Sequence, residues 1–443
     1  MAENAVNHGE MLVDGKPILE TLLADIASAE KSIHVSMFLF FRDPIGEEIG
    51  AALAKKAREG VTVRVLLNIA KTAMGDPFST GEKRMMRHDP NVHYDPTDVK
   101  PLCDEMKASG VKVLDTNIDY DAEPKVLEPR LQSLAAQIRG GVAIDDMHVD
   151  HRKIVVIDGR VGYCGGANVG AQYMYRVPFD PAKDAKAEGE ERKQAKLSEP
   201  WWKWHDSLTR FEGPIVNALD GHFRDRWLLD GGDEIAPSPP APAKGPPRGQ
   251  ALHDARVYCN EPNDQPNQVR DLYLRLIRDA RSSIFIENPY LYHPAVADAL
   301  CAAKNATPSL DVVLVVPSGE HNDNSFGQDA QEHEYLRYIE CGISVYEYQH
   351  HFNHLKMAVF DERWSIHGST NLNCRSLEDD KDFELVVLVD DAPFARWILE
   401  HVRDVDVRHS RRIGDADLHG TIAALRRRVR DPRTLAMLAK RVL

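Results

Sequence analysis

Two stretches of the sequence decide the fold: HRKIVVIDGRVGYCGGAN at 151–168 and HLKMAVFDERWSIHGSTN at 354–371. With one constant offset of 203 residues, five polar or special residues are among the positions at which they agree, and an accidental match of five such residues in fixed register is improbable. We therefore expect a duplicated unit with one copy of this motif in each half. The matched pairs are His151 and His354, Lys153 and Lys356, Asp158 and Asp361, Gly165 and Gly368, and Asn168 and Asn371.

Within each motif the residues predict a strand, a tight turn and a second strand. The stretch between the matched points is β-branched and aromatic, and Asp158 with Gly159 stands where a two-residue turn would fall. Side chains two apart on a strand point the same way, so each motif histidine shares a face with the lysine two residues later. If the halves pack with those faces together, two histidines and two lysines converge.

The segments around the motifs also repeat. A helical pattern precedes a β-branched run at 18–29 and 32–41, and again at 269–280 and 282–290. Alternation of this kind predicts an α/β fold with two similar halves, each a mixed sheet flanked by helices. We expect the halves to pack as a pseudo-twofold pair around one shared site. The predicted divisions are a first half at 1–230, a proline-rich linker at 231–250, a second half at 251–414 and a basic helical tail at 415–443.

Composition restricts the function further. The 443-residue chain carries a formal net charge of −14, which argues against a protein that grips a nucleic-acid backbone over a broad face. No run of residues is long and apolar enough for a membrane span, and no leader is evident at the start, so we expect a cytoplasmic protein. The six cysteines are scattered without CxxC spacing and are expected to be reduced thiols.

Two imidazoles and two ammonium groups in one cleft suit phosphodiester chemistry. The lysines, with Asn168, Asn371 and the hydroxyl of Ser369, can hold the non-bridging oxygens where negative charge develops. One imidazole can attack phosphorus while the other protonates the leaving oxygen, because the pKa of histidine lies near working pH. The residues alone leave open which histidine does which.

The duplicated HxKxxxxD pattern, followed by GG-x-N or GS-x-N, resembles the phospholipase D superfamily. Over roughly residues 10–410 the chain is most similar to bacterial cardiolipin synthases, notably at 14–68, at WHDSLTRFEGPIV from Trp204, at ENPYL from Glu287 and at HGSTNLNCRSLEDDKDFE from His367. The resemblance implies a metal-free site without cofactors, a phosphohistidine intermediate and a phosphatidyl group passed from one phosphatidylglycerol to another.

The resemblance also implies individual roles. His151 would be the nucleophile and His354 the general acid, with Lys153, Lys356, Asn168 and Asn371 as phosphate ligands. Each imidazole needs an acceptor at its far nitrogen, and the expected acceptors are Asp206 for His151 and Glu384 for His354. Asp158 and Asp361, with Gly165 and Gly368, are expected to support the hairpins rather than to touch phosphorus.

Several alternatives remain open. The same residues in a site that admits water would form a phospholipase D hydrolase releasing phosphatidic acid, and a phosphodiesterase acting on nucleic acid would need a basic stacking groove. A catalytically inactive scaffold is disfavoured because both motifs are intact. A metal site built on His148, Asp150 and His151, or on His350, His351 and His354, is a minor alternative.

The expected partner is a phospholipid at the inner face of the cell membrane. The basic, apolar tail at 415–443 is a candidate surface anchor, with packing on the protein's own acidic surface as the alternative. The tryptophans at 201, 202 and 204 could face lipid or fill a core corner. Acceptor specificity, oligomeric state and the roles of the inserts at 71–100 and 180–200 are left open by the sequence.

Overall fold

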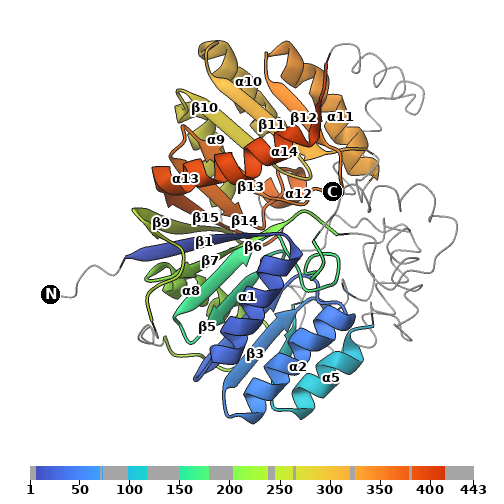
Figure 1. The fold of residues 1–443 in the computed structure, drawn as a ribbon, viewed down its shortest axis with the longest axis vertical. Helices are drawn as coiled ribbons and strands as arrows, with labels where there is room; N and C mark the ends of the chain where they lie inside the picture. Colours follow the sequence, from blue (N-terminus) through green and yellow to red (C-terminus); the bar gives the residue numbers. More distant parts are fainter. Residues whose placement is uncertain are drawn as a thin grey trace, which may run out of the picture.

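The computed structural model describes residues 6–69, 72, 98–116, 149–178, 203–237, 245–262, 266–319, 325–378 and 382–414. The predicted basic tail, the 180–200 segment, most of the 71–100 insert, His148 and the tryptophans at 201 and 202 lie outside these residues. Two mixed eight-stranded sheets dominate the structure, one in each half, and helices cover them (Figure 1). The predicted α/β fold with two similar halves is confirmed.

The first sheet has the strand order β4-β3-β2-β5-β6-β7-β1-β8. Strands β2, β3 and β4 are parallel, and the remaining pairs are antiparallel. The strands are β1 Asn7–Val13, β2 Ser32–Met37, β3 Thr62–Leu67, β4 Lys112–Asp115, β5 Ile154–Ile157, β6 Val161–Gly165, β7 Ser207–Glu212 and β8 Gln250–Leu252. The helices of this half are α1 Gly15–Ser28, α2 Pro44–Arg58, α5 Lys100–Ala108 and α8 Ile215–Leu229.

The second sheet has the order β16-β12-β11-β10-β13-β14-β15-β9, in which the seven strands from β12 to β9 repeat the order from β4 to β1. The eighth strand lies at opposite edges of the two sheets, as β8 beside β1 and β16 beside β12. Its strands are β9 Asp254–Asn260, β10 Ser283–Glu287, β11 Asp311–Pro317, β12 Ser344–Tyr348, β13 Met357–Phe360, β14 Trp364–Gly368, β15 Glu384–Asp390 and β16 Ser410–Arg412. Its helices are α9 Gln268–Asp279, α10 Pro294–Ala306, α11 Ser325–Glu340, α12 Cys374–Leu377, α13 Ala392–Ile398 and α14 Asp404–Arg408, with a π-helical turn at Leu399–Arg403 between the last two. The motif hairpins β5-β6 and β13-β14 occupy equivalent central places.

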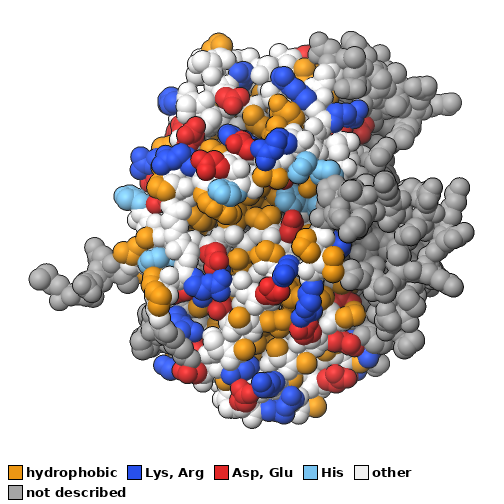
Figure 2. Space-filling view, in the orientation of Figure 1, with side chains coloured by type: hydrophobic (Ala, Val, Ile, Leu, Met, Phe, Trp, Pro, Cys, Tyr) orange, Lys and Arg blue, Asp and Glu red, His pale blue; other side chains and the backbone are white. Residues whose placement is uncertain are grey.

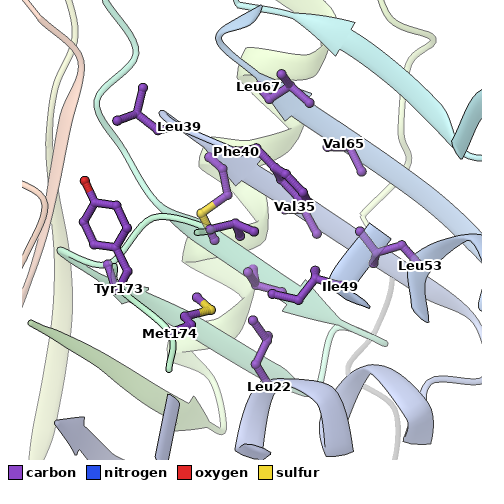
Figure 3. Close-up of a cluster of buried hydrophobic side chains, with 14 of the residues drawn as sticks. Leu22, Val35, Leu39, Phe40, Ile49, Leu53, Val65, Leu67, Tyr173 and Met174 are labelled. Carbon is purple, nitrogen blue, oxygen red and sulfur yellow. The ribbon is translucent and has the colours of Figure 1, made fainter. Parts of the chain in front are cut away.

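Both faces of each motif hairpin are buried. In β5, Val155 and Ile157 contribute to a core with α1 and α2, part of which is drawn in Figure 3. Ile154 and Val156 face the opposite way, into a second core that also contains Met357 of β13 and residues of α8 and α13. Burial on both sides explains why these strands read as continuous apolar runs. The second core contains side chains from both sheets and therefore joins the halves.

The motif aspartates anchor the hairpins to neighbouring segments. Asp158 has a φ of 55° in the β5-β6 turn, and its carboxylate accepts hydrogen bonds from the backbone N–H groups of 30, 31 and 32, just before β2. Asp361 has a φ of 51° and accepts from those of 281, 282 and 283, before β10. Each aspartate therefore ties its turn to the start of the adjacent strand.

The motif glycines allow close strand contact. A Cβ at Gly165 would lie 2.4 Å from the carbonyl oxygen of Ser207, and one at Gly368 would lie 2.2 Å from that of Leu385. Only glycine permits this approach between β6 and β7 and between β14 and β15. These contacts bring the first residues of β7 and β15 close to the motifs.

Two features differ from the sequence-based expectations. The residues 251 and 252 belong to β8, which pairs with β1, so the chain leaves the first sheet only after Leu252. The expectation of reduced cysteines is wrong for one pair, because Cys301 of α10 and Cys341 after α11 form a disulfide. Packing of these helices places the two Cα atoms 5.5 Å apart, a proximity that the chain separation of 40 residues does not reveal.

Candidate active site

The two motif histidines are held at the junction of the halves. The backbone N–H of His151 donates to the carbonyl of Phe383 (3.0 Å), and that of His354 donates to the carbonyl of His205 (2.8 Å). His151, which precedes β5, is thus bound to the segment before β15 of the second sheet. His354, which precedes β13, is bound to the segment before β7 of the first sheet. Burial lowers the pKa of His354 well below its ordinary value, and Lys356, Lys153 and His151 act in the same direction, as expected for side chains in one site.

The carboxylates pair with the histidines crosswise. Nδ1 of His151 lies 3.0 Å from Oε1 of Glu384, and Nδ1 of His354 lies 2.7 Å from Oδ2 of Asp206. The predicted pairs, Asp206 with His151 and Glu384 with His354, are therefore wrong, although all four residues are present. The physical reason is that Asp206 and Glu384 stand at the starts of β7 and β15, where those strands reach the other half.

Each carboxylate is fixed by further hydrogen bonds. Oδ1 of Asp206 accepts from the N–H of Ser207 (2.7 Å), and Oε1 of Glu384 accepts from the hydroxyl of Ser376 (2.6 Å). The hydroxyl of Ser369 donates to the other oxygen of Glu384. Its proton is therefore used within the protein, whereas the sequence predicted that it would bind the phosphate. In the first half, Gly166 takes the position of Ser369, and a Cβ there would lie 2.2 Å from Oδ1 of Asp206.

The two lysines lie beside their own histidines. Nζ of Lys153 donates to the carbonyl of His151 (2.5 Å). Nζ of Lys356 donates to the carbonyl of His354 (2.9 Å) and also lies 2.9 Å from its Nε2. Both side chains are buried, and burial lowers the pKa of Lys153 to about 7. A bound phosphate diester would offset this loss of hydration and favour the charged ammonium.

The two asparagines are not equivalent. Oδ1 of Asn168 accepts a hydrogen bond from the N–H of Leu39 (3.0 Å), which leaves the amide NH₂ as the donor. Oδ1 of Asn371 accepts no hydrogen bond from the described residues. Asn168 therefore also fixes the segment after β2, whereas the amide of Asn371 is held less firmly.

The surroundings of the two imidazoles differ. The ring of Phe38 meets His151 edge-on at 4.8 Å, and Nζ of Lys153 lies 5.0 Å from the centre of the same ring. Three aromatic rings lie near His354 instead, with centroid distances of 4.9 Å for Trp204, 5.5 Å for Phe352 and 5.8 Å for Tyr173. Trp204 is buried and thus belongs to the core beside the site.

Electrostatics separate the two histidine–carboxylate pairs. Burial lowers the pKa of His151, although Glu384 opposes this effect. The pKa of His354 is lowered well below its ordinary value, because burial and the charges of both lysines act in the same direction. The charges of His151 and Lys153 outweigh burial and hold the pKa of Glu384 below its ordinary value, whereas burial raises that of Asp206 to about 7. An ionised Glu384 can stabilise a positive charge on the His151 ring, and the Asp206 and His354 pair can hold a proton near neutral pH.

Sequence reasoning missed a second group of charges behind His151. The guanidinium of Arg152 is hydrogen-bonded to Asp150 (2.9 and 2.8 Å), and those of Arg152 and Arg226 lie 4.9 and 4.4 Å from the ring of Phe383. The repeat gave no signal for Arg152, because the matching residue in the second motif is a leucine. Because Asp150 is neutralised by this arginine, it is a poor metal ligand in the alternative built on His148, Asp150 and His151.

Comparison with known proteins identifies relatives over most of the chain. A family model described as cardiolipin synthase, PLD-like domain matches residues 22–177 and 273–405. The probable cardiolipin synthase YwiE of Bacillus subtilis (strain 168) is 26% identical over 412 residues, which cover 93% of this chain and 68% of that protein. The major cardiolipin synthase ClsA of the same organism is 25% identical over 401 residues, covering 90% and 68%.

A solved structure shares the fold. The crystal structure of phosphatidylserine synthase from Haemophilus influenzae Rd KW20 superposes with a TM-score of 0.59 at 13% sequence identity. The match covers 98% of this chain and 95% of that chain. At this identity the likeness establishes the architecture of two joined halves.

Proposed function

The chain belongs to the cardiolipin synthase, PLD-like domain family, and from this membership we propose that it is a phosphatidyltransferase that makes cardiolipin from phosphatidylglycerol. The observation that carries the proposal is the crossed pairing of two histidines with two buried carboxylates, beside two buried lysines, in one site. The proposed reaction needs neither metal nor cofactor, because these side chains supply the nucleophile, the acid and the charges that bind phosphate.

In the first step, Nε2 of His151 attacks the phosphorus of phosphatidylglycerol. A phosphorus–nitrogen bond forms, the phosphorus–oxygen bond to the headgroup glycerol breaks, and His354 gives a proton to the departing oxygen. The ionised Glu384 holds Nδ1 of His151 and stabilises the positive charge that develops on the ring. Lys153 and Lys356 stabilise the negative charge on the non-bridging oxygens.

In the second step, the hydroxyl of a second phosphatidylglycerol attacks the phosphohistidine. His354, now neutral, accepts the hydroxyl proton, the phosphorus–nitrogen bond breaks and His151 is regenerated. Water at the same position would give phosphatidic acid instead. The hydrolase alternative thus differs from the proposal only in the acceptor.

Binding of the substrate is coupled to the protonation of His354. Burial and the two lysine charges disfavour the imidazolium in the free site. The negative charge of a diester between the lysines would cancel part of that effect and raise the pKa of His354. The acid is therefore charged when the leaving group is present.

The substrate places the reaction at a membrane surface, and we propose peripheral contact with the inner face of the cell membrane. Among the described residues, no helix combines the length and apolar composition needed to cross a bilayer. On the face drawn in Figure 2, lysine and arginine side chains alternate with aspartate and glutamate, without a continuous basic stripe among the described residues. The formal net charge of −14 of the chain supports lipid over nucleic acid as the substrate class.

The test is incubation of the protein with labelled phosphatidylglycerol in vesicles, without added metal, followed by separation of the products. We expect cardiolipin and glycerol. Phosphatidic acid as the main product would identify a hydrolase, and lack of turnover combined with prompt DNA cleavage would overturn both assignments.

Trapping of the intermediate tests the nucleophile. Denaturation in detergent at mildly alkaline pH, where a phosphorus–nitrogen bond survives, should yield a phosphatidyl-enzyme adduct that is absent in His151→Ala. His253→Ala, which removes an exposed histidine between β8 and β9, serves as the control and should retain the adduct. An adduct at full yield in His151→Ala would show that another residue is the nucleophile.

A further inference from the structure

The imidazole of His205 is held between two carboxylates. Its Nδ1 lies 2.8 Å from Oδ1 of Asp14, and its Nε2 lies 3.2 Å from Oδ2 of Asp406. The ring is 6% exposed and stacks on Tyr348 at a centroid distance of 5.1 Å. The contact with Asp14 is a hydrogen bond, whereas the contact with Asp406 is a charge contact without hydrogen-bond geometry. A carboxylate on each side of the ring favours the imidazolium over the neutral ring.

The backbone of His205 supports His354 directly. Its N–H donates to the carbonyl of Phe352 (2.9 Å), and its carbonyl accepts from the N–H of His354 (2.8 Å). The next residue, Asp206, lies 2.7 Å from Nδ1 of the same imidazole. The dipeptide 205–206 thus contacts both the main chain and the ring of His354.

The two carboxylates that hold His205 are themselves fixed. Asp14 follows β1 with a φ of 66°, and its N–H donates to the carbonyl of Asp206 (2.9 Å). Asp406 of α14 is buried beside Glu287 at the end of β10, and Glu287 accepts a hydrogen bond from the side-chain amide of Asn353. The contacts of Asp406 therefore lead through Glu287 to Asn353, the residue that precedes His354.

The other half has the same backbone contact without a titratable group. Phe383 precedes Glu384 as His205 precedes Asp206, and its carbonyl accepts from the N–H of His151. The cations near Phe383 are the guanidiniums of Arg152 and Arg226, which stay charged throughout the working range of pH. Only the support of His354 depends on an imidazolium.

We propose that His205 is a positioning residue for the transfer reaction, acting as an imidazolium clamped by Asp14 and Asp406 that fixes the orientation of His354. This inference rests on the proposed function, in which His354 is the general acid. Loss of the imidazolium would leave the buried carboxylate of Asp406 and the partly exposed carboxylate of Asp14 on either side of an uncharged ring. Their repulsion would displace the segment that holds His354.

The charges around the ring favour the protonated form. Burial opposes it, but Asp14 and Asp406 raise the pKa of His205 well above its ordinary value. Tyr348 of β12 and His351 also face the ring, and Glu287 lies behind Asp406, where burial raises its pKa well above the usual range. The stabilisation is complete below the ordinary histidine pKa and is lost as the pH rises through the raised value of the folded protein.

The test compares two leaving groups in His205→Gln. With phosphatidylglycerol the departing alkoxide needs the proton of His354, so we expect glycerol release to slow on the order of 10- to 100-fold. With phosphatidyl-p-nitrophenol the phenolate leaves without a proton, so the first burst of nitrophenolate should stay within about threefold of the unaltered protein. His205→Arg, which restores a cation able to bridge two carboxylates, should recover much of the loss with phosphatidylglycerol.

A matched control is His34→Gln. His34 is another buried histidine paired with a carboxylate, at 2.7 Å from Asp220, but it lies on β2 against Phe223 of α8 and contacts none of the site residues named above. His34→Gln should reduce the release of glycerol and the release of nitrophenolate by the same factor, or leave both unchanged. This control separates the loss of a buried ion pair from the loss of positioning.

Three results would overturn the role of His205. They are an unchanged rate with phosphatidylglycerol in His205→Gln, equal losses with both leaving groups, and a stoichiometric metal ion in the purified protein that His205→Gln removes. The last outcome matters because donor atoms of His205, Glu287 and Asp406 lie within 4.8 Å of one another. Failure of the proposed function is seen separately, as the absence of a nitrophenolate burst in the unaltered protein.

Discussion

Gly166 has no side chain, and this leaves room for the carboxylate of Asp206 beside His354. Because a Cβ there would lie 2.2 Å from Oδ1 of Asp206, Gly166→Ala should push the carboxylate away from His354 and lower cardiolipin formation by about 100-fold. Gly221→Ala is the control, because the space around this residue of α8 is open and alanine should stabilise the helix by about 0.5–1 kcal/mol. Steady-state rates and thermal unfolding of both variants check the prediction, which a fully active Gly166→Ala would contradict.

The pKa of Lys153 predicts a pH dependence. Because burial lowers this pKa to about 7, the free enzyme loses the ammonium, and with it part of its phosphate binding, as the pH rises through about 7. We expect kcat/KM for phosphatidylglycerol to fall above that pH. Lys153→Arg keeps its charge, so its alkaline fall should move to higher pH even if its maximum rate is lower. A fall that remains near pH 7 in this variant would assign the titration to another group.

The individual site residues were the most predictable part of the molecule. The repeat alone identifies His151, Lys153, His354 and Lys356, because five matched positions define a register. The partners of the histidines were not predictable, since Asp206 and Glu384 lie outside the repeat and their pairing depends on which half each strand end faces. His205 was hidden for the same reason: its importance comes from Asp14 and Asp406, both remote in sequence.

The hairpin anchors give a prediction about stability. Asn tolerates the positive φ of both turns but loses the negative charge that three backbone N–H groups face. Asp158→Asn should lower the free energy of unfolding by about 1–3 kcal/mol, and Asp361→Asn by less, because Asp158 is buried and Asp361 is partly exposed. Urea unfolding measures both. Equal losses would show that burial does not decide the difference.

The contribution of Asp361 to stability should depend on pH. Although burial opposes ionisation, the N–H groups of 281–283 lower the pKa of Asp361. A carboxylate with a lowered folded pKa stabilises the protein above its ordinary pKa, and this contribution disappears as the pH falls through the folded value. The difference between Asp361→Asn and the unaltered protein should therefore shrink in acid, which unfolding curves at several pH values can check.

The strands of the two motifs followed from local pattern, because apolar, β-branched runs on both sides of a turn that begins with an aspartate leave little choice. The elements that did not follow are those set by contacts distant in sequence. Strand β8 forms because Gln250 and Ala251 pair with β1, and the Cys301–Cys341 disulfide forms because α10 and α11 pack together. Neither contact leaves a periodic signal in the chain.

The two halves should remain a functional unit when the chain between them is cut. A protease site inserted after Pro237, an exposed residue of the linker, would put the two motifs on separate chains. It would leave β8 paired with β1 and the shared core of β5, β13, α8 and α13 in place. We expect one species of full mass by gel filtration under native conditions, with at least half the activity. Dissociation after cutting would show that the linker, rather than the core, joins the halves.

The pseudo-twofold arrangement was predictable from duplication, since two matching motifs with one substrate phosphorus imply that the motifs face each other. The interlocking of the halves was not. Each histidine takes both its main-chain contact and its carboxylate from the opposite half, which only the meeting of the strand ends reveals.

This exchange of carboxylates is the arrangement that two identical subunits would form around a symmetry axis, with a single reaction centre on the axis. Joining the copies into one polypeptide frees them from identity. Here one half has a serine where the other has Gly166, and a phenylalanine where the other has His205. A single polypeptide can thus surround its two histidines with different residues, which two identical subunits could not do.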